Sequence, residues 1–252
     1  NIVFPPRVEY LATMIEEVSY VQTVEKLMEI VPPKRCQYLR VILMELSRIT
    51  SHLVYLGSAG IDLNVTSLWM YTFVPREKIL DIFEMVSGQR MMHGYMRVGG
   101  LQWDVPEGFE ARVRAEMEEL PRRLDEFEAL LTDNLIWRER LEGVALLSAE
   151  DALRYGCTGP ILRGSGVNYD VRKAFPYSSY EDFEFDVPLG QRGDAFDRYT
   201  VRMEEMRQSR RIILQALDRL PDGPVNVDDR KVALPPRRGA GRRRRRGRRG
   251  AA

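Results

Sequence analysis

The feature that most constrains the fold is an apolar stripe at the period of an α-helix, which recurs along much of the chain. Between residues 34 and 57, leucine or isoleucine returns every three to four positions, which places these side chains on one face of a helix that Gly57 can end. A second stripe runs from Leu11 to Ile30 and is stopped by Pro32 and Pro33. We expect these two helices to pack antiparallel across the short Pro-Pro turn.

The remaining segments predict a mainly α fold with irregular, glycine-rich connections. The patterns predict helices over Pro75 to Val86, Glu107 to Asp133, the stretch that Ser148 caps, and Asp197 to Leu220. Pro75 suits a first helical position and Gly88 closes that helix, whereas Pro121 kinks or divides the next. Residues 94–108 and 159–176 are predicted loops, and short strands are predicted near 184–187. We interpret residues 1–236 as one helical domain.

Composition excludes several classes of protein. The chain has 252 residues with 44% hydrophobic content, which is ordinary for a chain that buries a core. Asp62 interrupts the best apolar stretch, so no run reaches the roughly 18 apolar residues of a membrane helix, and a soluble or peripheral protein is expected. Two cysteines are too few for a disulfide framework. The first residues lack an initiator Met and a signal sequence, so we expect a fragment of a longer product.

The last residues differ from the rest of the chain. Residues 237–252 contain only Arg, Gly and Ala, and nine of the 38 Lys and Arg lie there, so the body is acidic. Such a run suits an arm that binds nucleic acid or another anionic surface. No aromatic residues flank it for base stacking, which favours a disordered or artefactual tail and no nucleic-acid partner.

Few residues suggest chemistry by themselves. The chain has two histidines and no Cys-x-x-Cys pair, so a metal centre or iron-sulfur cluster in this chain is not expected. The glycines of residues 159–166 lack the Lys-Ser/Thr that follows a phosphate loop. His52 lies near an apolar stripe and is interpreted as a hydrogen-bonded core residue. Composition and periodicity alone therefore leave the function open.

Several longer runs, in order and spacing, identify a family. Together they resemble the D-type subunit of NADH-quinone oxidoreductase, the 49 kDa subunit of respiratory complex I, over about Pro6 to Lys231. The runs are VEKLMEI (24–30), RVILMELSRITSHL (40–53), REKILDIFEMVSGQRMMH (76–93), RVGG (97–100), SAEDAL (148–153), LRGSGVNYDVRKAFPY (162–177) and DRYTVRMEEMRQS (197–209).

The resemblance implies a fold and partners. The family is similar to the large subunit of nickel-iron hydrogenases, so we expect a helical domain of that kind without its metal, lacking the N-terminal β region and the C-terminal part. The implied substrate is a quinone, and NADH and the iron-sulfur clusters belong to partner subunits. The implied partners are the small iron-sulfur subunit, the C-type subunit of the peripheral arm and the membrane subunit at the quinone channel, on the cytoplasmic face of a bacterial inner membrane. The fragment alone is expected to be inactive.

The resemblance also assigns a quinone site. Tyr10 matches the tyrosine that hydrogen-bonds a quinone carbonyl, and a phenol can donate that bond and a proton. Asp62 matches an aspartate that pairs with a quinone-site histidine on an N-terminal β-hairpin of the family, and a carboxylate there raises the pKa of that histidine. Ser58 and Met70 match positions that line the cavity. Tyr10 and Asp62 are the expected catalytic residues.

A second group matches residues near the terminal iron-sulfur cluster of the small iron-sulfur subunit. Arg7 would place a fixed cation there, which stabilises the reduced cluster. Arg90, Met92 and His93 fall in a segment that approaches the same cluster. Many relatives have Arg-Met-His where this chain has Arg90-Met91-Met92-His93. The resemblance assigns a redox-linked protonation to the histidine of that motif, and whether His93 takes over this role is left open by the extra methionine.

Two other functions fit parts of the sequence. One is a subunit of the same fold in a hydrogenase-related or ferredoxin-linked membrane complex, with a different electron donor. The other is an Arg-rich nucleic-acid-binding module. The interior match to the 49 kDa family favours the quinone-site subunit over both.

Overall fold

The computed structural model describes residues 2–228, and helices dominate them. The predicted tail of residues 237–252 lies outside the described residues. The elements in chain order are the 3₁₀ helix η1 (Pro5–Arg7), α1 (Thr13–Met28), α2 (Lys34–Asp62), α3 (Ser67–Ser87), β1 (Met96–Arg97), β2 (Gly100–Leu101), α4 (Phe109–Leu131), α5 (Leu135–Leu141), α6 (Ala149–Arg154), α7 (Gly159–Gly164), α8 (Val171–Ala174), the 3₁₀ helix η2 (Tyr180–Asp182) and α9 (Ala195–Asp218).

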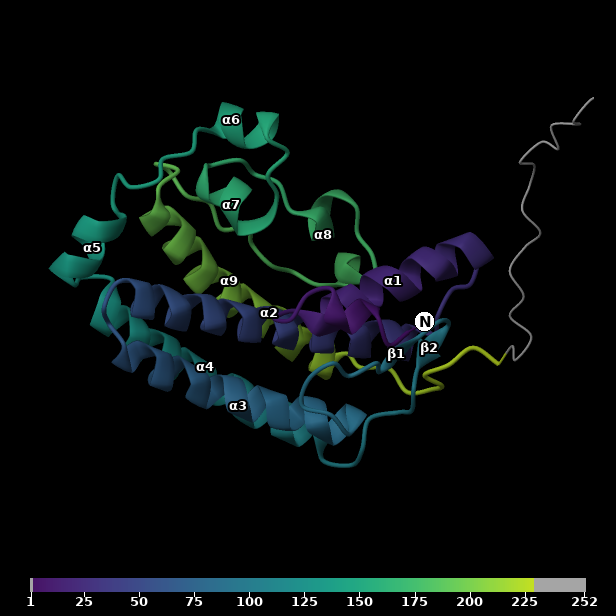
Figure 1. The fold of residues 1–252 in the computed structure, drawn as a ribbon. Coiled ribbons are helices and arrows are strands. Elements are labelled where there is room, and N and C mark those ends of the chain that lie inside the picture. The colour runs from purple at the N-terminus through teal and green to yellow at the C-terminus, as the bar shows by residue number, and fades with distance from the viewer. Residues whose placement is uncertain (1, 229–252) are drawn as a thin grey trace, which may run out of the picture.

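The long helix α2 is the centre of the fold. It packs against α3 and α9, which α4 also contacts, while α1 lies against α2 and β1. Figure 1 shows α2, α3 and α4 running along the length of the molecule, with α5, α6 and α7 gathered toward one end. Strands β1 and β2 pair antiparallel. An isolated bridge between Gly100 of β2 and Asn226 connects this pair to the last described residues.

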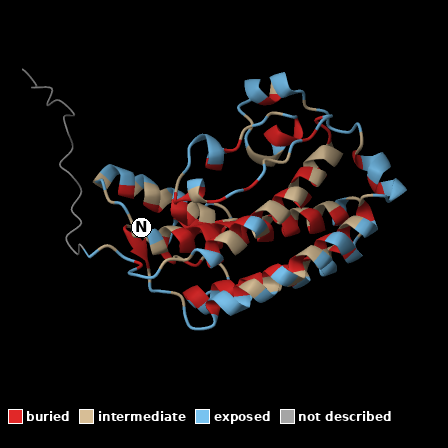
Figure 2. Ribbon diagram, turned by 180° about the vertical axis from the view of Figure 1, so that it is seen from behind, coloured by how far each residue is buried: buried red, intermediate tan, exposed pale blue. Residues whose placement is uncertain are grey.

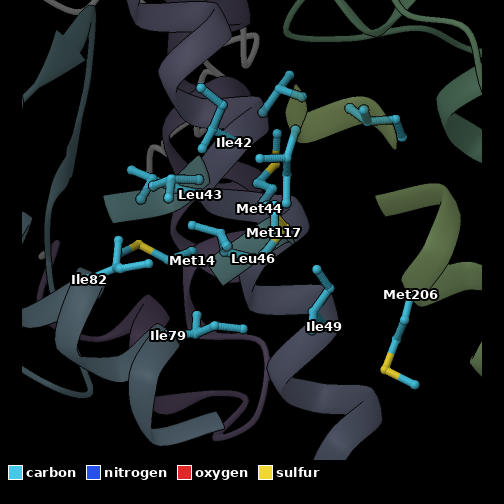
Figure 3. Packing of buried hydrophobic residues seen from close by; sticks show 14 of the residues in the cluster. Met14, Ile42, Leu43, Met44, Leu46, Ile49, Ile79, Ile82, Met117 and Met206 are labelled. Atoms are coloured by element: carbon cyan, nitrogen blue, oxygen red, sulfur yellow. The ribbon is translucent and has the colours of Figure 1, made fainter. Parts of the chain in front are cut away.

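One hydrophobic core runs through these helices. Figure 3 shows buried side chains of α2 meeting others from α1, α3, α4 and α9. Figure 2 shows that buried residues lie along the long helices, whereas α5 and α6 are largely exposed. The apolar residues of the predicted stripe of α2 all belong to this core. The core residues labelled in Figure 3 are Met14, Ile42, Leu43, Met44, Leu46, Ile49, Ile79, Ile82, Met117 and Met206.

The predicted mainly α architecture is confirmed, and several local predictions hold. The helix before the Pro-Pro turn ends at Met28, where Glu29 adopts a left-handed conformation with φ 57°. Ser148 caps α6 by accepting the N–H of Asp151 at 3.1 Å. His52 is buried and hydrogen-bonded, with Nε2 2.7 Å from Glu205 Oε2. Among residues 2–228, no helix is long and apolar enough to cross a membrane.

Two predicted helix boundaries are wrong because glycine and proline serve packing here. The helix expected to end at Gly57 continues to Asp62, since Gly57 lets α3 approach closely: a Cβ there would lie 2.6 Å from Thr72 Oγ1. The helix expected to begin at Pro75 begins at Ser67, with Pro75 inside it. The contacts of the first two turns of α3 with α2 outweigh the one hydrogen bond that proline removes.

The region after α6 also differs from its prediction. Residues 159–164 form α7 and not a loop, because Leu162 and Arg163 are buried and α7 packs on α9. No strand forms at 184–187 in the described structure. Instead, two glutamines of α9 accept the N–H groups of that segment, Gln215 from Glu184 and Gln208 from Asp186, each at 3.0 Å. Helix α5 was not predicted.

A buried network of charges attaches the irregular region to the helices. Arg172 lies 3.1 Å from Glu45 on α2 and 2.6 Å from Asp170. Arg163 pairs with Glu205 on α9 at 2.5 Å. Glu45 also accepts hydrogen bonds from Tyr180 and Ser209 and pairs with Arg48. Because Glu45, Asp170 and Glu205 each have a guanidinium partner, the desolvation cost of these three charges is offset.

Candidate functional site

Three of the residues assigned to the cluster side line one surface hollow. Arg7 on η1 meets Met92 and His93, which follow α3, around a hollow of about 200 Å³. Met92 adopts a left-handed backbone conformation with φ 57°, which turns the chain between α3 and β1. The other residues around the hollow are Ile2, Val3, Ser87, Gln89, Gly94, Arg97 and Gln102.

Both nitrogens of the His93 ring have partners. Nε2 lies 3.1 Å from the carbonyl oxygen of Arg90, and a carbonyl can only accept, so Nε2 carries the proton. Nδ1, 3.2 Å from Thr13 Oγ1, then accepts from the hydroxyl. Phe83 packs against the ring edge-on at 4.9 Å. Burial lowers the pKa of His93 to about 4, so the imidazole is neutral at physiological pH.

Arg90 does not line this hollow with its side chain. Its guanidinium is exposed and pairs with acids on the outer face of α3, namely Glu77, Asp81 at 3.2 Å and Glu84 at 4.0 Å. The hydrogen bond that Arg90 donates to Glu77 raises the pKa of Arg90. The contribution of Arg90 to the hollow is its backbone carbonyl, which fixes the tautomer of His93.

Among the described residues, 2–228, no carboxylate lies within ion-pair distance of two guanidinium groups at the hollow. Arg7 donates to the carbonyl of Val3, and Arg97 donates to the carbonyl of Gly94. Within residues 2–228 neither forms a salt bridge, unlike the arginines of α4. The hollow is therefore a basic site with a neutral imidazole in its wall.

Three of the four residues assigned to the quinone site, Ser58, Asp62 and Met70, lie on the hairpin that α2 and α3 form. Ser58 and Asp62 belong to the last turns of α2, where Ser58 is half-buried and Asp62 is exposed. Met70 lies in the first turn of α3 and is 71% exposed. Arg140 of α5 donates to the carbonyl of Leu63 at 2.8 Å, which holds α5 beside this hairpin. Tyr71 and Val74, on the same helix as Met70, are also exposed apolar residues.

Tyr10 lies in the turn between η1 and α1, and its ring is exposed. The turn is held by Glu9, whose carboxylate accepts the N–H groups of Leu11 and Ala12. No hydrogen bond or ion pair joins Tyr10 to Asp62, Ser58 or Met70 within residues 2–228. The structure therefore brings Arg7, Met92 and His93 together at one hollow. The residues assigned to the quinone site lie on two separate segments.

Sequence reasoning missed residues that build the hollow from α1. Thr13 and Glu17 contact the segment after α3, and both are buried. Neither belongs to a recognisable motif. Their hydrogen-bond partners lie some 80 residues away in the sequence, so no local pattern signals the contact. Arg97 lies in the RVGG run, which offered a signal for it. In residues 2–228, no group of three or more His, Cys, Asp or Glu side chains is arranged to hold a metal ion.

The fold and the site define a helical protein that carries its candidate residues at surface hollows and exposed turns. Comparison with known proteins gives its family. Residues 62–246 match the family model of the 49 kDa subunit of respiratory-chain NADH dehydrogenase, and the chain belongs to this family.

Named relatives agree with this membership. The chain is 50% identical over 237 residues to NADH-quinone oxidoreductase subunit 4 of Thermus thermophilus, covering 94% of this chain and 58% of the relative. It is 48% identical over 235 residues to the D-type NADH-quinone oxidoreductase subunit of Desulforamulus reducens, covering 93% and 64%. The same subunit of Geotalea uraniireducens is 50% identical over 231 residues, covering 92% and 59%. The chain thus spans about three fifths of the length of these relatives.

Proposed function

We propose that this chain belongs to the quinone-site subunit of a proton-pumping NADH-quinone oxidoreductase and supports quinone reduction near the terminal iron-sulfur cluster of a partner. The family membership and the names of the relatives support the enzyme class. One observation carries the proposal for the site. Arg7 and His93, assigned separately to the cluster side, meet around one basic hollow.

The chemistry of the hollow suits a neighbouring redox centre that gains negative charge. Two guanidinium groups without carboxylate partners, those of Arg7 and Arg97, favour the reduced form of such a centre and raise its potential. His93 is neutral and already fully hydrogen-bonded, so it contributes a dipole and no charge at neutral pH. Met92 and the carbonyl of Arg90 complete this side. In this proposal the chain binds no metal, and the cluster belongs to the partner.

The quinone side consists of Tyr10, Asp62, Ser58 and Met70. In this proposal the exposed phenol of Tyr10 donates a hydrogen bond to a quinone carbonyl and then a proton to the reduced headgroup. Asp62 pairs with a histidine from outside this chain and supplies that histidine with protons. Ser58 and the apolar side chain of Met70 line the wall along which the quinone enters.

Exposed apolar residues beside Tyr10 and beside Met70 support the proposal that partner subunits cover both of these segments. Phe4 and Val8 are 64% and 77% exposed beside Tyr10, and Tyr71 is 59% exposed beside Met70. Apolar patches of this kind mark interaction surfaces. We assign them to the small iron-sulfur subunit and to the membrane subunit at the quinone channel, with the C-type subunit of the peripheral arm as a further neighbour. NADH and the clusters reside on partners, and in this proposal the chain lies peripherally at the cytoplasmic face of the bacterial inner membrane.

The experiment compares two assays on the purified complex that contains this protein. Tyr10→Phe keeps the ring and removes the hydroxyl, so NADH-to-quinone activity should fall by about 10²-fold while assembly survives. Asp62→Asn should lower the same activity. NADH-to-ferricyanide activity, which bypasses the quinone, should be normal in both variants. Tyr155→Phe is the matched control, because Tyr155 is an exposed tyrosine after α6, outside the candidate site.

Two results would count against the proposal. Unchanged quinone reduction in Tyr10→Phe would remove this tyrosine from the site. Equal loss of both activities would mean that the complex has come apart, and the chemistry assigned to these residues would lose its support.

A further inference from the structure

Glu17 of α1 is a fully buried carboxylate held by backbone alone. Its Oε1 accepts the N–H of Gly94 at 2.7 Å, and its Oε2 accepts those of Tyr95 at 2.8 Å and Met96 at 3.0 Å. Within residues 2–228 no Lys, Arg or His side chain lies within ion-pair distance of it. A buried charge without an ion-pair partner is costly, and here the three backbone N–H groups are what offset that cost.

The geometry requires a carboxylate at this position. Both oxygens face N–H donors, so a protonated oxygen or an amide NH₂ would bring a donor against a donor. Burial raises the pKa of Glu17, while the three N–H bonds oppose that shift. The charge of Arg97 also acts to lower the pKa. The carboxylate of Glu17 therefore fixes the backbone of residues 94–96, and the N–H groups of that segment fill its hydrogen-bonding capacity in return.

Helix α1 also binds His93, the residue that precedes this segment. Thr13, one helical turn before Glu17, donates to Nδ1 of His93. Thr13 and Glu17 thus hold four consecutive residues, 93–96, against α1. On either side of this stretch lie Met92 and Arg97, which line the basic hollow. The positions of His93 and Arg97 relative to Arg7 are therefore set from α1.

We propose that Glu17 is a positioning residue for the redox site: by fixing the backbone of residues 94–96, it holds His93 and Arg97 at the hollow that faces the partner's cluster. This inference rests on the proposed function. The reacting groups do not touch Glu17, which acts through the segment that it binds. Its effect is on the environment of the cluster, and hence on the rate at which electrons reach the quinone.

The test uses the purified complex with Glu17→Gln and Glu17→Asp. A shift of about 1 Å in a positioned group can cost about 10²-fold in rate, so Glu17→Gln should lower NADH-to-quinone activity by about tenfold or more. Ferricyanide activity should stay normal. The electron paramagnetic resonance spectrum of the terminal cluster should change in its g-values, and the midpoint potential of the cluster, from a redox titration of that signal, should shift. Glu17→Asp retains the charge but is one methylene shorter, and should show the same changes at smaller size.

Glu25 provides the matched control. It lies two turns later on α1, is buried, and accepts the N–H of Gly99 at 2.7 Å, but it is paired with Arg40 and does not line the hollow. Glu25→Gln should lower the thermal stability of the complex and leave the resonance spectrum of the cluster unchanged. If Glu25→Gln produced the same spectral change, general loosening of the fold would explain both variants, and the inference would be overturned.

The other outcomes separate the inference from the proposed function. A wild-type spectrum and wild-type quinone rate in both Glu17 variants, with Tyr10→Phe impaired, would reject Glu17 and leave the function standing. A spectrum that changes in Glu17→Gln while Tyr10→Phe is fully active would support the positioning role and reject the assigned quinone chemistry. If Glu17→Gln does not assemble, Glu17→Asp decides: an unchanged spectrum in it rejects the inference.

Discussion

The hydroxyl of Thr13 lies 3.2 Å from Nδ1 of His93, although 80 residues separate the two in sequence. The contact joins the first turn of α1 to the segment that follows α3. It also satisfies the one ring nitrogen of His93 that the carbonyl of Arg90 leaves free. The carbonyl of Arg90 sets the tautomer of His93, and the hydrogen bond from Thr13 holds the imidazole against α1.

Removing this hydroxyl should destabilise the protein. Thr13→Val keeps the shape of the side chain and leaves a buried nitrogen without a donor, which costs about 1–3 kcal/mol. Urea unfolding of the purified chain measures the change. Thr23→Val is the control, since Thr23 is exposed on the same helix and bonds only to the carbonyl of Ser19; its change should stay within about 0.5 kcal/mol. Equal values for the two variants would contradict the role of the Thr13 contact.

The pH dependence of stability should report His93. Its pKa is lowered from 6.5 to about 4 in the folded protein, so below pH 6.5 the unfolded chain binds the proton more readily. The free energy of unfolding therefore falls as pH drops from about 6.5 to about 4, by up to about 3 kcal/mol from this residue. Above pH 6.5 the residue contributes no pH dependence.

The measurement is the difference between the wild-type and His93→Gln stability curves. Buried acids such as Glu205, whose pKa is lowered to about 2, lose their contribution mainly below pH 4.5 and appear in both curves. The slope between pH 6.5 and 4 should be shallower in the variant. Parallel curves across this window would show that His93 titrates normally in the folded state.

The buried ion network should be sensitive to the loss of one member. Arg172→Met removes the nearest guanidinium partner of buried Asp170 and one of the two guanidinium partners of buried Glu45, which costs about 3–5 kcal/mol. Arg211→Met is the control, because Arg211 pairs with Asp186 at an exposed site and such pairs contribute about 1 kcal/mol or less. Urea unfolding of both variants tests the contrast, and a small effect of Arg172→Met would mean that water replaces the guanidinium.

The close approach of α2 and α3 depends on Gly57. Gly57→Ala would gain helix propensity of about 1 kcal/mol, but its Cβ would lie 2.6 Å from Thr72 Oγ1, and overpacking typically costs about 1–3 kcal/mol. We expect a net loss in the midpoint of thermal unfolding. Ser51→Ala on the same helix, away from this contact, should not lower the midpoint, and a stabilised Gly57→Ala would mean that the helices separate without cost.

Helices whose signals are local could be predicted from the sequence. The stripe of residues 34–57, the Pro-Pro turn and the Ser148 cap each act over a few positions of the chain, and each produced the expected element. The boundaries at Gly57 and Pro75 could not be predicted in this way. Both residues are placed for contact between helices, and their neighbours come from another part of the chain.

The candidate site divides along the same line. The sequence by itself determined the family through its ordered runs and the helical class through its periodicity. Through the family resemblance it also named Arg7, Arg90, Met92 and His93 as one group. Only the tertiary structure decided that Arg90 turns toward the acids of α3, that Arg97 joins the hollow, and that Thr13 and Glu17 hold its wall. The physical reason is that periodicity and caps are properties of neighbouring residues, whereas a hydrogen bond between residues 80 positions apart exists only once the helices have packed.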